Sequence, residues 1–344
     1  MKILTLVTST NACDYHRVVN PFRFLPLEDR ESLKIIEHDQ QVSAMAFKNA
    51  DLVVFNRYPP FDLDHILSLR DRFKFKIWVD IDDYWKLYPG HYLEAHWKRD
   101  KTEQKIIKAL SIADIVTVTN RRLLRAVLPI NEKARIIPNA IPIGFDQFLS
   151  QKQESTTVRF MYAGGPSHGK DLKSIEKFFT LMGKNACTYK NVEFILAGYS
   201  DRYKEPALHE MNDIMSRAPN YSTLLGLPVN KYMNHYNFAD VCLSPLIKNE
   251  FNEMKSNLKI IEAGCMRCPI ICTNMFPFLE DEKMRAKGVF YCNNAADWND
   301  VCTYLIKNPN LIVEYGNQLY DYVKEHYDLL EINKIRREII NSFK

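Results

Sequence analysis

The sequence lacks long hydrophobic runs, a strong charge of one sign and internal repeats. No apolar stretch reaches the roughly 18 residues that a membrane-spanning helix needs. The short apolar start, residues 1–7, looks like a strand entering a polar loop and not like a signal peptide. The net charge of +4 is far below the basic footprint of a DNA-binding domain, although it suits an anionic ligand such as a nucleotide. We expect a soluble, cytoplasmic chain.

The eight cysteines lack the spacing of a secreted disulfide scaffold or of a zinc site. Cys265, Cys268 and Cys272 lie close together in the sequence. However, no second Cys/His pair at zinc spacing follows them, and Pro269 interrupts the segment. Apolar neighbours, as on both sides of Cys242, are typical of core positions. We expect buried free thiols and no metal or redox centre.

The sequence does contain an alternation of short β-rich runs with helical patterns over 344 residues, 46% of them apolar. This length suits two domains, and the alternation indicates parallel sheets wrapped by helices. Two prolines within residues 138–142, followed by a polar stretch at residues 151–155, are typical of a linker. We predict an α/β chain of two doubly wound domains, residues 1–145 and 155–312. Helices over residues 313–344 are expected to pack back toward the first domain.

Twelve strands are predicted, six in each half. They are residues 2–8, 33–37, 52–56, 76–81, 115–119, 135–137, 158–163, 192–197, 222–226, 241–244, 269–273 and 289–292. Helical patterns of the first half include residues 21–27, 63–72 and 101–113. Ligands bind beyond the carboxyl ends of the strands in such sheets. The cleft between two facing domains is therefore the expected site.

Two segments of the second half have the character of a phosphate site. In the first, residues 164–171, small residues follow a predicted strand and let backbone N–H groups approach an anion, and Lys170 adds a positive charge. The second is a helix expected to begin near Ser256, with free N–H groups at its start. Glu262, nearly two turns along, can bind ribose hydroxyls. The structural alternatives are a glycine turn and a surface helix with a Lys259–Glu262 pair.

Together these segments resemble the nucleotide-sugar half of family-4-like GT-B glycosyltransferases (glycosyl transferases group 1). The resemblance covers about residues 158–275. It rests on motifs in the family's order: the Gly-rich turn with its Lys, Ile195-Leu196-Ala197-Gly198, Leu225-Gly226-Leu227, the Y-x-x-A-D-V-x-L-x-P run at residues 236–245, and the helix carrying Lys255 and Glu262. It implies a GT-B fold, which is two Rossmann-like doubly wound domains facing a central cleft. It also implies a nucleoside diphosphate sugar as donor.

The resemblance assigns donor binding to a set of glycines, cations and helix-start residues. They are Gly164, Gly165, His168, Lys170, Gly226, Leu227, Lys255, Ser256, Asn257, Leu258 and Glu262. Two departures matter. The family's Arg is replaced by Gly165, which makes Lys255 the candidate for the missing charge, and the family's first Glu falls at Met254. The donor sugar therefore does not carry over, although a UDP-sugar is the expected co-substrate and no cofactor is expected.

The first half offers an Asp-rich segment, residues 80–83, and a loop after the first strand. The segment looks like the D-x-D-D segment of a subset of these glycosyltransferases, and its carboxylates suit a metal site, a general base with its supporters, or a helix cap. Arg17 suits a phosphate contact or a surface position at a helix start. The predicted catalytic residues are Asp82, Asp83 and His91, and the predicted acceptor or cleft residues are Asp14, Tyr15, Arg17 and Asp80. No metal is expected, because GT-B enzymes usually offset diphosphate charge with basic groups and helix dipoles.

The resemblance implies a hexosyl- or pentosyltransferase that retains configuration and acts on a hydroxyl acceptor. The acceptor stays open between a glycan and a hydroxymethylated base in DNA, as in phage DNA-modifying enzymes. Basic and aromatic stretches at residues 70–76, 97–101 and 121–125 can follow a phosphate backbone, or they can form solvated helix faces. Two other functions fit the same fold: a sugar-nucleotide epimerase and a non-catalytic nucleotide-sugar binding module.

Overall fold

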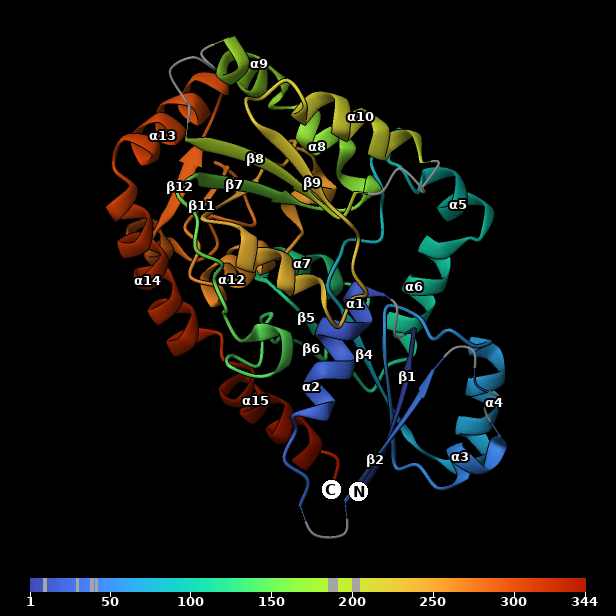
Figure 1. Ribbon diagram of the computed structural model, residues 1–344. Helices are drawn as coiled ribbons and strands as arrows, with labels where there is room; N and C mark the ends of the chain where they lie inside the picture. Colours follow the sequence, from blue (N-terminus) through green and yellow to red (C-terminus); the bar gives the residue numbers. More distant parts are fainter. Residues whose placement is uncertain (9–10, 29–30, 38–39, 41–42, 185–190, 200–204) are drawn as a thin grey trace. The chain divides into compact units, whose positions relative to one another are not determined.

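The computed structural model describes residues 1–8, 11–28, 31–37, 40, 43–184, 191–199 and 205–344. The chain divides into two units (Figure 1). Unit 1 is Met1–Pro142, Met254–Ser256 and Tyr327–Lys344, and unit 2 is Ile143–Glu253 and Asn257–His326. Each unit contains one six-stranded sheet, in which every strand pair is parallel.

The sheet of unit 1 has the order β2-β1-β3-β4-β5-β6. Its strands are β1 (Lys2–Val7), β2 (Ser32–Glu37), β3 (Leu52–Asn56), β4 (Lys76–Ile81), β5 (Ile115–Val118) and β6 (Ala134–Ile136). Its helices are α1 (Ala12–Asp14), the π-helical turn η1 (Tyr15–Val19), α2 (Asn20–Arg23), α3 (Ala44–Lys48), α4 (Leu63–Phe73), α5 (Glu94–Arg99), α6 (Thr102–Ile112), α7 (Arg121–Val127) and α15 (Leu329–Asn341).

The central strands of unit 1 are apolar on both faces, since helices cover both sides of a parallel sheet. All five residues of β3 are buried. One face packs against η1, α2 and α15, where Val18, Phe22 and Ile339 meet Trp78 of the sheet. Helices α3 and α4 lie on the other side (Figure 1). The final helix of the chain thus completes the core of the first unit.

The sheet of unit 2 has the order β12-β11-β10-β7-β8-β9. Its strands are β7 (Val158–Ala163), β8 (Val192–Ala197), β9 (Tyr221–Leu224), β10 (Val241–Ser244), β11 (Ile270–Thr273) and β12 (Val289–Cys292). Its α-helices are α8 (Gly169–Lys173), α9 (Glu176–Lys184), α10 (Pro206–Met215), α11 (Glu250–Glu253), α12 (Leu258–Cys265), α13 (Ala295–Lys307) and α14 (Pro309–His326). Its 3-10 turns are η2 (Asp146–Phe148), η3 (Pro166–His168), η5 (Tyr232–Phe238) and η6 (Glu282–Ala286).

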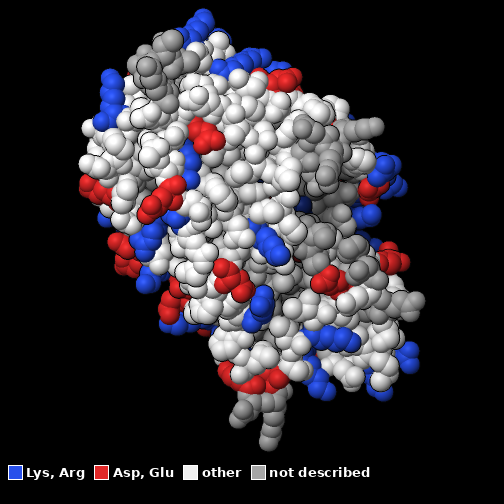
Figure 2. All heavy atoms as spheres, in the orientation of Figure 1, with Lys and Arg blue, Asp and Glu red and all other residues white. Residues whose placement is uncertain are grey.

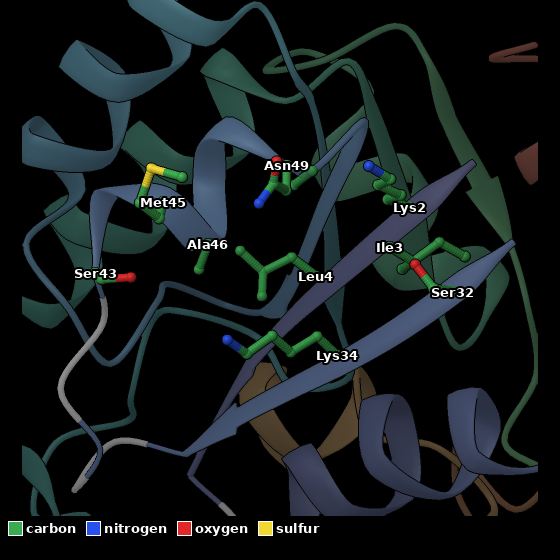
Figure 3. Close-up of a pocket in the computed structure, with 10 residues that line it drawn as sticks. Lys2, Ile3, Leu4, Ser32, Lys34, Ser43, Met45, Ala46 and Asn49 are labelled. Atoms are coloured by element: carbon green, nitrogen blue, oxygen red, sulfur yellow. The ribbon is translucent and has the colours of Figure 1, made fainter.

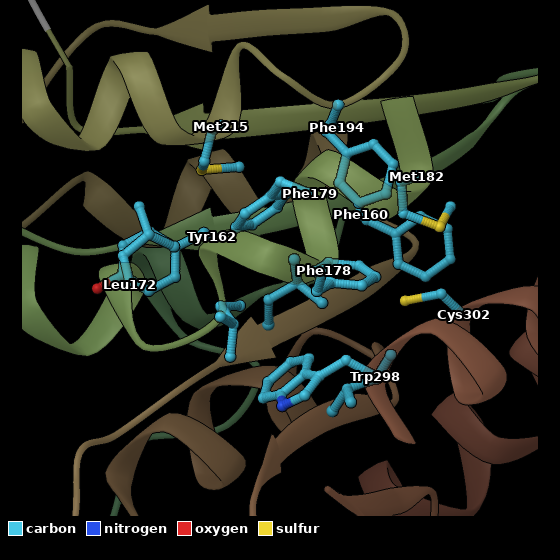
Figure 4. Close-up of a cluster of buried hydrophobic side chains, with 14 of the residues drawn as sticks. Phe160, Tyr162, Leu172, Phe178, Phe179, Met182, Phe194, Met215, Trp298 and Cys302 are labelled. Atoms are coloured by element: carbon cyan, nitrogen blue, oxygen red, sulfur yellow. The ribbon is translucent and has the colours of Figure 1, made fainter. Parts of the chain in front are cut away.

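An aromatic cluster forms the core of unit 2 on the face covered by α9, α10 and α13 (Figure 4). Phe160 of β7 and Phe194 of β8 stack with ring centroids 5.3 Å apart. Phe178 and Phe179 from α9 lie against Phe194, and Trp298 of α13 contacts Phe178. Aromatic side chains bury a large apolar area each, so this cluster fixes α9 and α13 on the strands that carry the candidate site.

The two parallel sheets confirm the predicted doubly wound α/β class. Each predicted strand is present, with ends within two residues of the prediction. The helix predicted at residues 21–27 is misplaced, because helical structure begins at Ala12 and ends at Arg23. Asn11 caps this early start by accepting a hydrogen bond from the Cys13 N–H. Within the described ranges, no helix is both long and apolar enough to cross a membrane.

The cysteines with described positions are free thiols: Cys13, Cys242, Cys265, Cys268, Cys272, Cys292 and Cys302. All of these except Cys13 are buried, as expected for core thiols. Cys187 lies outside the described residues.

Candidate functional site

Both sheets reverse their strand order at one point. In unit 1 the chain moves from β1 to β2 on one side and then to β3 on the other, and in unit 2 it moves from β7 to β8 and β9 before β10 forms on the other side. The loops beyond the carboxyl ends of the two bordering strands diverge at such a point and leave a crevice, where doubly wound sheets bind ligands. A ligand bound at these points would contact the loops after β1 and β3 in unit 1, and after β7 and β10 in unit 2.

Gly164 and Gly165 follow β7, at the switch point of unit 2. A Cβ atom on Gly164 would lie 2.8 Å from the hydroxyl oxygen of Tyr162 and 3.0 Å from its ring. Tyr162 is only 4% exposed and belongs to the aromatic core, so its ring has little room to move. A Cβ atom on Gly165 would meet no heavy atom of the described residues within 4 Å. The backbone at Gly165 is therefore open to a ligand, as a phosphate loop requires.

These two glycines give a matched pair of variants. We expect Gly164→Ala to lower the free energy of unfolding by about 1–3 kcal/mol, because the added methyl group overpacks Tyr162. Gly165→Ala should leave stability unchanged but weaken UDP binding if the donor approaches this backbone. Denaturant unfolding and calorimetric titration with UDP measure the two effects. Equal stability of the variants, or undiminished UDP binding by Gly165→Ala, contradicts this account of the loop.

His168 and Lys170 lie on the turn and helix that follow the glycines, in η3 and α8. Lys170 is exposed, and His168 is partly exposed with its Nδ1 atom 2.8 Å from a carboxylate oxygen of Asp171. Asp171 is buried, and no sequence motif pointed to it. The loop therefore combines open backbone with two side chains able to meet a phosphate.

Gly226 and Leu227 follow β9, at the same edge of the sheet. Leu225 is 69% exposed and Leu227 is 40% exposed, which leaves an apolar surface on this loop. Burial lowers the pKa of His235, so its neutral ring can donate from Nε2 to the Leu225 carbonyl at 2.7 Å. A loop anchored in this way with exposed leucines suits contact with a flat, apolar face such as that of a nucleobase.

Helix α12 begins at Leu258, with Asn257 at its N-cap position, two residues later than the predicted start. Glu262 of this helix is 2% exposed and accepts hydrogen bonds from three side chains. Tyr232 Oη donates to Oε1 at 2.5 Å, and Tyr236 Oη and Lys259 Nζ approach Oε2 at 2.7 and 2.9 Å. The Lys259–Glu262 pair expected of a surface helix is thus present, but it holds a buried carboxylate. The contact of Glu262 with ribose stays a prediction.

Lys255 and Ser256 belong to unit 1 through the short segment Met254–Ser256. The Nζ atom of Lys255 lies 3.6 Å from a carboxylate oxygen of Asp83. The Asn139 side chain donates to the Ser256 hydroxyl at 2.6 Å. Lys255, the predicted substitute for the family's Arg, is therefore paired with an acidic residue that was itself a candidate.

Arg17 and Asp80 form a buried ion pair in unit 1. The guanidinium donates from Nε and one terminal nitrogen to the two carboxylate oxygens at 2.7 and 2.8 Å, and the side chains are 0% and 4% exposed. Arg17 also donates to the side chain of Asn139 and to the Ile137 carbonyl. Burial alone lowers the pKa of Arg17, but Asp80 raises it above its usual value. The sequence suggested a phosphate contact or a surface position for Arg17, and the structure places it in the core.

Arg57 organises the carboxyl ends of β3 and β4, although no sequence motif pointed to it. Its backbone has φ = 57°, a left-handed conformation that is unusual for a residue with a side chain. Its guanidinium donates to Asp82 at 3.2 Å and to Asp83 at 3.1 Å, and it also contacts the Cys13 thiol. Burial tends to raise the pKa of Asp82, but Arg57 holds it below its usual range. The loop residue Cys13 and the Asp-rich segment therefore meet around one cation.

The ligand atoms of Cys13, Asp82 and Asp83 lie within 4.8 Å of one another, a spacing that a metal ion could bridge. However, the Arg57 guanidinium contacts all three groups. A permanently charged guanidinium neutralises the carboxylates and repels a second cation. The donor set as folded does not suit a metal.

Asp14 lies next to this cluster and is 7% exposed. Its carboxylate accepts a hydrogen bond from the Thr8 N–H at 2.6 Å. Burial raises the pKa of Asp14 to about 7. Asp14 is thus a carboxyl group that exchanges its proton near neutral pH.

The raised pKa of Asp14 predicts a stability that falls as the pH rises. Between its ordinary pKa of 3.8 and about 7, the folded state keeps a proton that the unfolded state has lost. Relative to Asp14→Asn, the wild-type free energy of unfolding should therefore drop by about 1.4 kcal/mol per pH unit in this window and level off above it. Urea unfolding at several pH values measures this difference. Parallel profiles for the two proteins contradict the raised pKa.

The contacts described for His91 and Tyr15 are with residues close to each of them in the sequence. The Nδ1 atom of His91 accepts a hydrogen bond from the Leu93 N–H at 3.1 Å, and its ring lies edge-on to Tyr88 with centroids 5.0 Å apart. Tyr15 is buried and packs edge-on to His16. The contacts described for His91 are those of a turn-stabilising residue, and its catalytic role stays a prediction.

A cavity of about 230 Å³ lies in unit 1 between β1, β2 and α3 (Figure 3). Lys2 and Ser32, which line it, are the first residues of β1 and β2. The cavity thus lies toward the amino ends of these strands, whereas the candidate residues follow carboxyl ends. None of the candidate residues lines it, so we do not connect it with the site.

No protein-family model matches the sequence, and no curated protein does. Solved structures do match. HepE from Anabaena, in complex with UDP and glucose, has a TM-score of 0.69 and 11% identity, with 99% of this chain and 100% of HepE covered. Sucrose-phosphate synthase from Thermosynechococcus elongatus has a TM-score of 0.66 and 14% identity over 99% of this chain and 98% of the synthase.

TarM matches 85% of the chain with a TM-score of 0.60 and 16% identity. The match spans only 54% of TarM, about half of its length. Sequence identities this low are evidence for a shared fold only. Two parallel doubly wound sheets, each with candidate residues at its switch point, together with these similarities show that the chain has the GT-B fold found in glycosyltransferase structures.

Proposed function

We propose that this chain is a glycosyltransferase that moves a sugar from a nucleoside diphosphate sugar to a hydroxyl group. The observation that carries the proposal is the loop after β7, where open backbone at Gly165 lies beside His168 and Lys170 at a switch point. Solved structures of similar fold contain UDP or UDP-glucose. These complexes support a UDP-sugar as the donor.

Unit 2 would bind the donor. The backbone at Gly165, the start of α12 and Lys170 would meet the diphosphate, while the loop at Gly226 and Leu227 would hold the base and Glu262 the ribose. Catalysis would consist chiefly of stabilising the departing diphosphate, an electrostatic task for preorganised N–H groups and cations. The proposal requires no metal, and a chelator should leave transfer unchanged.

Unit 1 would supply the general base that takes the proton from the acceptor hydroxyl group. A general base works best with a pKa near the operating pH, and Asp14, with a pKa of about 7, meets this condition better than Asp82, whose pKa is lowered. Asp82 and Asp83 would then act by holding Arg57. Retention of configuration allows a leaving phosphate oxygen to take the proton instead. The anomeric configuration of the product, read by NMR, and the rate of Asp14→Asn separate these routes.

We propose a glycan as the acceptor. Four cations from two of the stretches that could follow DNA, residues 70–76 and 97–101, are paired with acidic neighbours: Arg70 and Lys76 with Asp114, Lys98 with Glu94, and Arg99 with Asp100. On the face shown in Figure 2, basic and acidic side chains are interspersed. Paired charges give a weaker field than a continuous basic stripe. These features favour a neutral saccharide over a DNA backbone.

Thermal-shift measurements with nucleotide sugars test the donor, since a bound ligand stabilises the fold according to its occupancy. Mass spectrometry with the best donor then tests glycans and hydroxymethylated DNA as acceptors. Transfer to DNA with a steep salt dependence would replace the glycan proposal. Conversion of the donor to an isomer without an acceptor would indicate an epimerase, and binding without any conversion a binding module. The absence of a shift with every donor contradicts the proposal.

A further inference from the structure

A single buried carboxylate, that of Asp171, joins two loops of unit 2. Asp171 is on α8 and is 2% exposed. One oxygen lies 2.8 Å from Nδ1 of His168. The other accepts hydrogen bonds from the Ile247 N–H at 3.0 Å and from Nδ2 of Asn252 at 2.9 Å. Asn252, itself 1% exposed, also donates to the Ile247 carbonyl at 3.0 Å.

These contacts bridge the switch point of the sheet. His168 lies in the loop after β7, and Ile247 lies in the loop after β10. Strands β7 and β10 are hydrogen-bonded neighbours, and the strand order reverses between them. These two loops border the crevice of a doubly wound sheet. The hydrogen bonds of the Asp171 carboxylate therefore fix the position of one loop relative to the other. Burying a carboxylate costs free energy unless it accepts hydrogen bonds, and these partners provide them.

The same carboxylate orients the ring of His168. The His168 side chain is 28% exposed and that of Asp171 is 3% exposed, so the pair has a buried end and an open end. An ionised carboxylate only accepts hydrogen bonds, which makes Nδ1 the proton-bearing atom and leaves Nε2 as the outer atom of the ring. When the ring is protonated, Nε2–H is a charged donor, which forms strong hydrogen bonds to phosphate.

We propose that Asp171 is the positioning residue of the donor site and acts through His168, whose Nε2 atom contacts the diphosphate of the nucleotide sugar. This inference rests on the proposed function and adds to it the residue that positions the His168 ring for its contact with the diphosphate. Lys170, next to Asp171 in the sequence, lies on the exposed side of α8 and adds charge. Asp171 itself touches no substrate atom.

Calorimetric titration with two probes, UDP and uridine, tests this inference. His168→Ala should raise the Kd for UDP by about tenfold or more, as expected for a lost charged hydrogen bond. It should leave the Kd for uridine unchanged, because uridine lacks the diphosphate. Asp171→Asn keeps an oxygen for Ile247 and Asn252 but turns an N–H group toward the ring. It should weaken UDP binding several-fold and spare uridine.

The double variant decides whether Asp171 acts through His168. In the His168→Ala background, Asp171→Asn should cause no further loss of UDP affinity, since the ring that it positions is gone. Lys173→Ala, on the same helix but paired with Glu210 at the surface, is the matched control and should bind both probes as the wild type does. Thermal unfolding of each variant verifies folding.

Three results would overturn the inference. They are additive effects of the two substitutions, equal losses for UDP and uridine, and unchanged UDP binding by His168→Ala. In each of these cases a wild-type protein that binds UDP leaves the proposed function standing. A wild-type protein that binds neither UDP nor any other nucleoside diphosphate contradicts the proposed function, and the inference falls with it.

Discussion

Glu262→Gln is expected to reduce kcat/KM for sugar transfer by about tenfold to a hundredfold, the range for loss of a hydrogen bond to a charged group. The substitution keeps the shape of the side chain, but it replaces one carboxylate oxygen with an amide nitrogen, which only donates hydrogen bonds. Tyr232, Tyr236 and Lys259 all direct their polar atoms at this group. If the carboxylate binds the ribose, the ribose hydroxyl groups of the nucleotide sugar lose an oxygen that accepts their hydrogen bonds. The surrounding side chains then compete for the one oxygen that remains.

Steady-state kinetics with the best donor and thermal unfolding measure the effect of Glu262→Gln. Tyr236→Phe is the matched control, because it removes one hydrogen bond to Glu262 and leaves the carboxylate in place. We expect it to reduce transfer less than Glu262→Gln does. If Glu262→Gln lowers the unfolding temperature while the Kd of the donor and kcat/KM stay at wild-type values, Glu262 serves only the internal network.

The second large effect concerns stability. We expect Asp80→Ala to lower the free energy of unfolding by about 3–5 kcal/mol, because it leaves the Arg17 guanidinium charged and unpaired in the core. Asp80 also accepts a hydrogen bond from Thr117 Oγ1 at 2.5 Å, which is lost as well. Such a loss is a large part of the roughly 5–15 kcal/mol that stabilises an ordinary domain.

Denaturant unfolding of Asp80→Ala is compared with that of Asp64→Ala. Asp64 pairs with Lys108, and these side chains are 71% and 47% exposed, so the loss there should be below about 1 kcal/mol. Replacing both buried partners, as in Arg17→Met with Asp80→Leu, should be less damaging than Asp80→Ala, because no buried charge is left over. Equal stability of Asp80→Ala and Asp64→Ala contradicts a structural role for the ion pair.

Local pattern predicted the elements well and their boundaries less well. Strand β3, with its five buried residues, has a continuous apolar run that is typical of a central parallel strand. The helical segment after β1 was placed too late, because its start depends on a short-range cap by Asn11 and its interior carries polar residues such as Arg17 and Asn20. Arg17 is buried against Asp80 and Asn139, which lie far away in the sequence, and helical periodicity does not reveal such partners.

By itself, the sequence determined the doubly wound α/β class, the likeness to GT-B glycosyltransferases and the loop of Gly164 and Gly165. Short-range features encode each of these: alternating element patterns and small residues directly after a strand. Only the tertiary structure decided the partners of the charged groups. It placed Arg17 in the core, put Arg57 between Cys13 and the Asp-rich segment, and linked Asp171 to the loop after β10. The physical reason is that parallel strands bring their carboxyl ends to one edge of the sheet, so residues far apart in sequence become neighbours there.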